Sequence, residues 1–385
     1  MKRLVISIIC VLCIMLISTY SSAMPLVFAD KEILASNAKA SLLVDFESDT
    51  VLYENNSNAR FPIASMVKLM TILLTYEAIE SGNLTLDTMI TTSENASGMG
   101  GSQVFIDPYV EYKAEDLLKS VVMASANDAS VALAEFISGS ETAFVNAMNK
   151  KAQELGMKNT LYANCTGLPA PEQYSSAYDC FLVLKQLMKY DHYHTLSTIW
   201  MDKLVHPSGR ETELVNTNKL IRYYKGCDSG KTGSTSEAGY CLTASAKRDD
   251  FRLVAVIIGS KNGQQRFTDV STLFNYGFAN YENKLILDCS KPVVENVMVK
   301  MSKQKVTNVY AKESYYGLSK KGNPNEYEFK YELQEIKAPK KAGDKVGTIL
   351  ITKQGQVVKE IDLIINEDIQ KLTYFDSVKR IAENW

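Results

Sequence analysis

The chain has 385 residues, which is more than one average domain, so two domains can bury a core without disulfides or a structural metal. Its 42 basic and 44 acidic side chains nearly cancel and leave a formal charge of -2. This balance argues against nucleic acid, or any other strongly charged polymer, as the main partner.

The N-terminal residues have the pattern of an export signal. A short positive region at residues 1–3 precedes the almost unbroken apolar run Leu4–Ile17, which small residues follow. The pattern predicts a secretory signal peptide over residues 1–29, cleaved after Ala29, with an uncleaved anchor as the alternative. We therefore expect the mature chain to be exported and extracytoplasmic.

Cysteine and histidine usage predicts neither a disulfide framework nor a metal site, and no cofactor is expected. Two of the seven cysteines lie in the apolar signal, and the other five have no paired spacing: Cys165, Cys180, Cys227, Cys241 and Cys289. His192, His194 and His206 fall in one stretch but lack acidic or cysteine partners at ligand spacing.

The residues after the signal predict one α/β domain over residues 30–283. Strand patterns come first and last, at residues 38–53, Gly239–Ala246 and Phe251–Ile258. Helical patterns occupy the middle and the end: Ser65–Ser81, Ala114–Ile137, Glu141–Leu155 and Gln265–Tyr281. We expect a sheet that joins distant parts of the chain and is covered by helices.

The hydrophobic pattern of the sequence changes from residue 284 onward. Short alternating runs separated by Gly, Pro and Lys predict a small all-β, sandwich-like domain over residues 284–372. Over residues 373–385 the apolar side chains fall on one helical face, and Trp385 suits a membrane interface. This last segment predicts an amphipathic helix at the membrane surface, or else a helix packed on its own domain.

Ser65 and Lys68 lie three residues apart at the start of a predicted helix, hence on one face and within hydrogen-bonding reach. A serine hydroxyl becomes a good nucleophile when a neutral lysine takes its proton, and burial favours a neutral lysine. The helix N-terminus adds N–H groups where an oxyanion would form. The pair suits acyl-enzyme chemistry, although the same S-x-x-K spacing recurs at residues 36–39 and 302–305, where no strongly apolar helix begins.

A second polar pair, Ser125 and Asn127, lies inside the apolar pattern of Ala114–Ile137. Polar side chains in such surroundings need partners or a function. A similar triplet at residues 93–95 lies in a polar, Gly-rich loop, where we expect it to be solvated.

A third motif, Lys231-Thr232-Gly233, occurs once and leads into the strand that begins at Gly239. A lysine and a hydroxyl at a strand edge can hold a substrate carboxylate, and a glycine lets a ligand backbone lie close to the strand. Each motif is weak alone, but the three in this order form a strong signal.

These motifs resemble the S-x-x-K, S-D-N and K-T-G set of class A β-lactamases and penicillin-binding proteins. Their surroundings are similar to the low-molecular-weight D-Ala-D-Ala carboxypeptidases of the penicillin-binding protein 5 type, over residues 62–71, 125–129, 164–168, 175–179 and 228–233. The resemblance covers the whole mature chain. It implies the penicillin-binding, β-lactamase-like transpeptidase fold, in which helices cover an antiparallel sheet, followed by the β-rich domain and terminal helix.

The resemblance also implies an activity: removal of the terminal D-alanine from peptidoglycan stem pentapeptides, with penicillin as a covalent inhibitor. It implies a place on the outer face of the cytoplasmic membrane. By motif position, Ser65 would be the nucleophile, Lys68 its general base and Ser125 a proton relay to the leaving amine. Asn127 would orient Lys68 and the substrate amide.

The resemblance implies a substrate-binding set as well: Lys231, Thr232, Gly233, Ser234 and Arg266. In that set Lys231 and Thr232 would hold the terminal carboxylate with help from Arg266. The backbone N–H groups of Ser65 and Ser234 would form the oxyanion hole.

Two positions depart from the pattern of many relatives, which have histidine where this chain has Gln173 and Ser234. Rate or substrate preference can therefore differ. Cys227 and Cys241 flank the K-T-G motif, and we interpret them as small buried side chains rather than reactive thiols.

Other activities on this scaffold stay open to different degrees. A β-lactamase would need an E-x-x-N loop between the second and third motifs, and the sole match, Glu213–Asn216, lies just before the third. A D,D-endopeptidase or transpeptidase is the alternative function, because the sequence does not show what accepts the acyl group. A non-catalytic peptidoglycan or β-lactam binder is disfavoured because every catalytic residue type is present.

Overall fold

The computed structural model of the protein describes residues 34–323, 326–376 and 378. The predicted signal peptide over residues 1–29 lies outside this part of the chain. Among the described helices, none is both long and apolar enough to cross a membrane.

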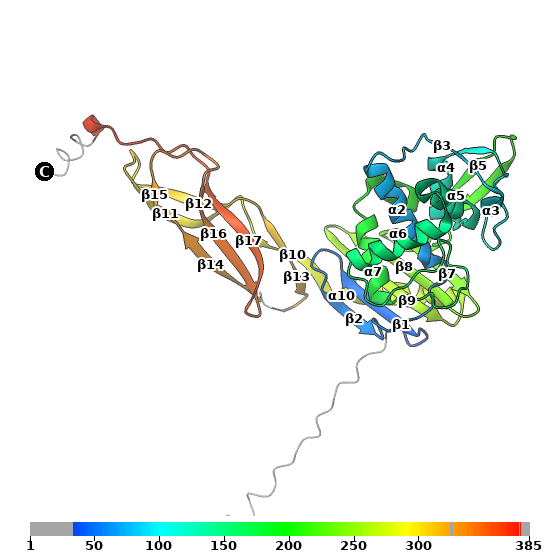
Figure 1. The fold of residues 1–385 in the computed structure, drawn as a ribbon. Coiled ribbons are helices and arrows are strands. Elements are labelled where there is room, and N and C mark those ends of the chain that lie inside the picture. The colour runs from blue at the N-terminus through cyan, green and yellow to red at the C-terminus, as the bar shows by residue number, and fades with distance from the viewer. Residues whose placement is uncertain (1–33, 324–325, 377, 379–385) are drawn as a thin grey trace, which may run out of the picture. The chain divides into compact units, whose positions relative to one another are not determined.

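Five antiparallel strands form the sheet of the N-terminal region in the order β2-β1-β9-β8-β7. Their bounds are β1 (Ala40–Asp45), β2 (Val51–Asn55), β7 (Cys227–Thr235), β8 (Gly239–Arg248) and β9 (Phe251–Ser260). β1 is buried along its whole length because it lies between β2 and β9, with Leu42 opposite Val256. The first and last strands of the region therefore pair, which confirms the predicted sheet (Figure 1).

The short 3-10 helix η1 (Ala64–Val67) leads into the helices of this region. These are α2 (Lys68–Glu80), α3 (Glu94–Ser97), α4 (Ala114–Ala124), α5 (Asn127–Ser138), α6 (Glu141–Glu154), α7 (Ala177–Leu187), α8 (Asp191–Thr198), α9 (Leu220–Tyr223) and α10 (Gly263–Asn280).

Helices cover both faces of the sheet because alternate side chains of a buried strand point opposite ways. Leu42 and Val44 of β1 join one large core with residues of α2, α4, α5 and α7. Leu43 points to the other face, where α10 lies so close that a Cβ on Gly277 would approach it to 3.1 Å. The predicted α/β architecture is confirmed.

Two helices replace the single helix predicted over Ala114–Ile137, and the prediction was wrong in that respect. α4 ends at Ala124 because Ser125 adopts a left-handed backbone with φ 63°, which a continuous helix excludes. α5 then begins at Asn127, so the break is too short to disturb the apolar periodicity. Ser125 therefore lies at a sharp corner between two helices.

Two small two-stranded sheets were not predicted: β3 (Met89–Thr91) with β4 (Glu111–Lys113), and the hairpin of β5 (Met201–Val205) and β6 (Glu211–Val215). Each of these strands buries a single residue while its other residues are exposed or half-buried. One buried position is too little for a period of two to show in the sequence.

The C-terminal region is built from strands and has a core of its own, which confirms the predicted β-rich fold. β10 (Tyr281–Leu287) pairs with β13 (Tyr315–Lys320). A six-stranded sheet has the order β14-β16-β17-β12-β11-β15. Its strands are β11 (Pro292–Lys300), β12 (Val306–Ala311), β14 (Tyr327–Leu333), β15 (Ile336–Lys337), β16 (Lys345–Lys353) and β17 (Gln356–Ile365).

The amphipathic helix predicted over residues 373–385 lies mostly outside the described residues. Tyr374, Phe375 and Asp376 are helical, and the side chains of Tyr374 and Phe375 are 79% and 81% exposed.

Candidate active site

Ser65 and Lys68 meet at the junction of η1 and α2. Ser65 lies in η1, and Lys68 is the first residue of α2, where its side chain is fully buried among apolar residues. Lys68 Nζ lies 3.1 Å from Ser65 Oγ. Ala64, just before the serine, has a left-handed φ of 49°, so the backbone turns sharply at this point.

Two further oxygens complete the surroundings of the Lys68 amine. Lys68 Nζ lies 2.6 Å from Asn127 Oδ1 and also donates to the carbonyl oxygen of Thr166. The Asn127 side chain is held in this orientation because its Nδ2 donates to Gly100 O at 2.6 Å. Burial lowers the pKa of Lys68 to about 7, so a large fraction of this lysine is neutral at neutral pH.

Ser125 and Lys231 form the second hydrogen-bonded pair of the site. The left-handed corner at Ser125 brings its hydroxyl to 2.8 Å from Lys231 Nζ, which also donates to Thr232 O at 3.0 Å. Lys231 is buried, and its pKa lies well below the usual range because of that burial and the nearby charges of Lys68 and Arg266. The two lysine pairs are linked through the junction between α4 and α5, because Ser125 bonds to Lys231 and Asn127 bonds to Lys68.

The K-T-G segment lies on β7, the last strand of the sheet, so one edge of that strand has no β partner within the sheet. Gly233 comes so close to the nucleophile that a Cβ there would approach Ile63 O to 2.5 Å and Ser65 N to 3.0 Å. Only glycine permits this approach. The next residue, Ser234, is exposed and lies opposite Tyr240 of β8.

Arg266 reaches the same strand from the first turn of α10. Its Nη1 lies 3.2 Å from Gly233 O, and its guanidinium packs against the rings of Phe267 and Tyr240. Among the described residues, no carboxylate lies within ion-pair distance of Lys68, Lys231 or Arg266. The site therefore concentrates basic groups that an incoming carboxylate can neutralise.

The structure thus brings together every predicted site residue, but sequence reasoning missed two backbone groups. The carbonyl oxygens of Thr166 and Gly100 accept hydrogen bonds from Lys68 and from Asn127. A search for reactive side chains does not find such groups, because any residue type carries a carbonyl. The resemblance over residues 164–168 was the one signal that pointed to this segment.

The flanking cysteines are buried, as interpreted from the sequence. Burial raises the pKa of Cys227 to about 12 and that of Cys241 to about 11, so both stay protonated thiols. The described cysteines are all free. Low thiolate content makes Cys227 and Cys241 poor nucleophiles.

The E-x-x-N match belongs to the β5–β6 hairpin and the residue after it. Glu213 is exposed opposite Lys203, and the Asn216 amide donates to the carbonyls of Ser197 and Ile199. These contacts give the segment a structural role, which further disfavours the β-lactamase alternative.

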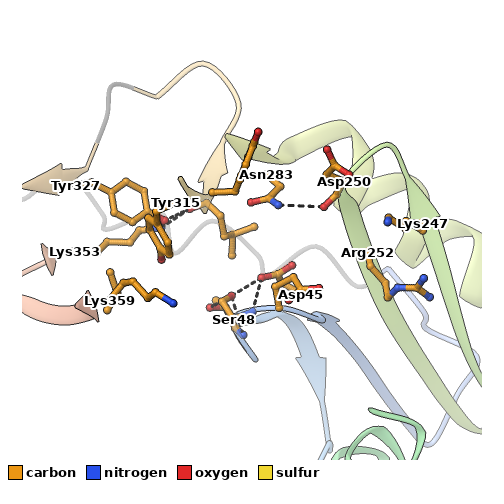
Figure 2. Close-up of a pocket in the computed structure, with 15 residues that line it drawn as sticks. Asp45, Ser48, Lys247, Asp250, Arg252, Asn283, Tyr315, Tyr327, Lys353 and Lys359 are labelled. Atoms are coloured by element: carbon orange, nitrogen blue, oxygen red, sulfur yellow. Dashed lines mark hydrogen bonds between the residues drawn. The ribbon is translucent and has the colours of Figure 1, made fainter. Parts of the chain in front are cut away.

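A separate hollow involves none of the site residues (Figure 2). In it Asp45 accepts from the Ser48 backbone N–H at 3.0 Å, and Asn283 Nδ2 donates to Asp250 O at 3.1 Å. The Ser48 hydroxyl also donates to the Asp45 carboxylate.

The fold and the site define a serine hydrolase of the penicillin-binding kind, and the comparisons agree. Residues 27–262 match the D-alanyl-D-alanine carboxypeptidase family, and residues 281–371 match the C-terminal domain of penicillin-binding protein 5. The chain belongs to the D-alanyl-D-alanine carboxypeptidase family.

Individual relatives cover most of the chain. It is 41% identical to D-alanyl-D-alanine carboxypeptidase DacF of Bacillus subtilis, over 91% of each chain. It is 30% identical to D-alanyl-D-alanine endopeptidase of Escherichia coli, over 61% of this chain and 75% of the relative. Among solved structures, penicillin-binding protein 5 from Haemophilus influenzae superimposes with a TM-score of 0.69 at 29% identity, over 87% of this chain and 98% of the other.

Proposed function

We propose that the protein removes the terminal D-alanine from peptidoglycan stem pentapeptides through an acyl-enzyme on Ser65. Ser65 Oγ attacks the carbonyl carbon of the penultimate D-alanine, the C–N bond to the last D-alanine breaks, and water then hydrolyses the ester. The observation that carries the proposal is a fully buried lysine amine 3.1 Å from the serine hydroxyl, where burial lowers the lysine pKa to about 7.

Lys68 acts as the general base in this scheme. Its neutral amine takes the Ser65 hydroxyl proton as the Oγ–C bond forms. A base whose pKa lies close to the working pH is effective because it is often neutral and still binds a proton well.

The proton then has to reach the departing amine. Ser125 is the relay. It lies at the corner between α4 and α5, and its hydroxyl accepts a hydrogen bond from Lys231. Its hydroxyl donates a proton to the leaving nitrogen and takes one from Lys68, which received it from Ser65, so that D-alanine leaves with a neutral amine.

The substrate carboxylate is bound at β7. Lys231 and Thr232 hold it, and Arg266 adds positive charge from α10. The arriving carboxylate also supplies the opposite charge that favours the cationic form of Lys231. A free C-terminal carboxylate is thereby recognised.

Backbone N–H groups of Ser65 and Ser234 form the oxyanion hole. The close approach at Gly233 brings β7 against η1, so both N–H groups can point at one oxygen of the tetrahedral intermediate. Penicillin carries a reactive carbonyl and a carboxylate, so we expect it to acylate Ser65 in the same geometry.

We place the protein outside the cytoplasm, exported by residues 1–29 and held on the outer face of the cytoplasmic membrane by residues 373–385. The exposed rings of Tyr374 and Phe375 support attachment of this segment to a surface. The domain bounds 30–283 and 284–372 belong to the same proposal.

An endopeptidase is the second candidate, supported by the likeness to the D-alanyl-D-alanine endopeptidase noted above. The test compares a stem pentapeptide with a cross-linked stem-peptide dimer and quantifies released D-alanine and cleaved dimer by mass spectrometry. We expect D-alanine release from the pentapeptide to dominate, and Ser65→Ala to abolish it. Faster cleavage of the dimer would favour the endopeptidase, and neither product would support a non-catalytic binder.

A further inference from the structure

The turn formed by residues 163–168, here called the carbonyl turn, presents the Thr166 carbonyl to Lys68. We propose that Asn164 and Gln173 are positioning residues for catalysis: they fix the carbonyl turn so that the lone pair of neutral Lys68 points at Ser65. The inference rests on the proposed function of Ser65 and Lys68.

The reason lies in the hydrogen-bond count of a neutral amine, which has two N–H donors and one lone pair. Lys68 Nζ has three neighbours, and two of them, Asn127 Oδ1 and Thr166 O, can only accept hydrogen bonds. They take both N–H groups, which leaves the lone pair for the third neighbour, the Ser65 hydroxyl at 3.1 Å. Loss of either acceptor would let the amine rotate and point an N–H at Ser65.

Asn164 is itself part of the carbonyl turn and holds it through its side-chain amide. Its Oδ1 accepts from the backbone N–H of Gly167 at 2.7 Å and of Thr166 at 3.2 Å, and its Nδ2 donates to Leu168 O at 2.9 Å. These bonds form an Asx-type turn, in which a side chain replaces a backbone partner. They determine which way the peptide plane after Thr166 faces.

Gln173 lies five residues after the carbonyl turn and holds it through its side-chain amide. Its Oε1 accepts from the backbone N–H of Ala163 at 3.0 Å and of Asn164 at 3.1 Å, while its Nε2 donates to Leu168 O at 3.0 Å. One amide therefore ties both ends of the carbonyl turn together.

The turn is packed directly behind the nucleophile. Thr71, one turn after Lys68 on α2, donates to Cys165 O at 2.7 Å, and Glu141 of α6 accepts from Cys165 N at 3.1 Å. Gly167 has φ 81°, and a Cβ there would lie 2.1 Å from Ala64 O. A shift of the turn is therefore transmitted to the segment that carries Ser65.

This arrangement predicts a selective kinetic effect. Neither Asn164 nor Gln173 hydrogen-bonds to the carboxylate-binding residues Lys231, Thr232 and Arg266, so removal of either amide should spare substrate binding. It should slow acylation, because small misplacements of a catalytic group cost about tenfold to a hundredfold in rate.

A matched control lies close by. Asn149 of α6 holds Tyr162 with the same kind of amide clasp, accepting from Tyr162 N at 2.9 Å and donating to Tyr162 O at 2.8 Å. It stabilises the chain just before the carbonyl turn without touching Thr166. Asn149→Ala therefore reports the cost of losing an amide clasp that makes no hydrogen bond to the carbonyl turn.

The experiment measures single-turnover acylation by a labelled penicillin in Asn164→Ala, Gln173→Ala and Asn149→Ala, with thermal unfolding measured for each. We expect the maximal acylation rate constant to fall about tenfold or more in the first two, with the penicillin concentration at half-maximal rate unchanged. Asn149→Ala should lower stability by a similar amount yet keep the wild-type rate constant. Asn164→Asp keeps the acceptor for the Thr166 and Gly167 N–H groups but loses the donor to Leu168 O, so it should recover only part of the rate.

Equal rate constants for Asn164→Ala, Gln173→Ala and Asn149→Ala would overturn the proposal. So would a loss confined to the half-maximal concentration, since that locates the defect in binding. Failure of the proposed function would give a different result. The wild-type protein would then form no penicillin adduct, or would form the same adduct as Ser65→Ala.

Discussion

The start of α2 and the edge strand β7 each bury a lysine in one site, but the two regions give these lysines different partners. Each lysine faces a serine hydroxyl, but Lys68 also faces two acceptor-only oxygens, those of Asn127 and Thr166, whereas Lys231 faces only one, the Thr232 carbonyl of its own strand. Burial lowers the pKa of both. Burial alone therefore does not assign a role, and the partners distinguish a proton acceptor from an anion receptor.

The largest expected effect comes from making the base permanently charged. Lys68→Arg keeps a cation in the same place, but a guanidinium does not lose its proton in proteins, so acylation of Ser65 should fall about 10³-fold. Stopped-flow acylation by penicillin checks this. Loss of less than about tenfold would mean that Lys68 is not the base.

A smaller effect is expected at the anion receptor, and it should depend on the substrate. Lys231→Gln should reduce kcat/KM about 10²-fold for a peptide with a free C-terminal carboxylate, because one charged hydrogen bond is lost. For the same peptide with a C-terminal amide the loss should be far smaller. Equal losses on both peptides would contradict a role in carboxylate binding.

Arg266 should behave as a weaker version of Lys231. Its guanidinium already bonds to Gly233 O, so Arg266→Gln should cost about tenfold in kcat/KM on the free carboxylate peptide, mostly through KM. Steady-state kinetics on the carboxylate and amide peptides separates this from a folding defect. A fall in kcat alone would instead place Arg266 in the chemistry.

The smallest effect is expected from the thiols beside β7. Because burial keeps Cys227 and Cys241 protonated, iodoacetamide should leave both unmodified and activity unchanged in the native protein. Peptide mapping after alkylation checks this, with unfolded protein as the control. Modification of Cys241 together with loss of activity would show a reactive thiol at the site.

The sequence predicted both lysines as site residues, because side-chain chemistry and hydrophobic periodicity are local properties. The Ser65–Lys68 spacing lies at the start of a strong apolar helix pattern. The K-T-G motif at Lys231 was found as a motif leading into the strand that begins at Gly239, but strand β7, which carries it, was not among the predicted strands. The left-handed corner at Ser125 was missed because α5 resumes the apolar periodicity at once. The Thr166 carbonyl was missed because a backbone acceptor has no signature in residue type and needs the tertiary fold to reach Lys68.

The pH dependence of Ser65 acylation tests the central claim most directly. Lys68 accepts a proton only when neutral, so acylation should be slow well below its pKa, rise with pH through about 7 and level off above it. Single-turnover acylation by penicillin, with the adduct located on Ser65 by mass spectrometry, gives this profile. A rate constant that is unchanged or falls as the pH rises through about 7 would contradict the account.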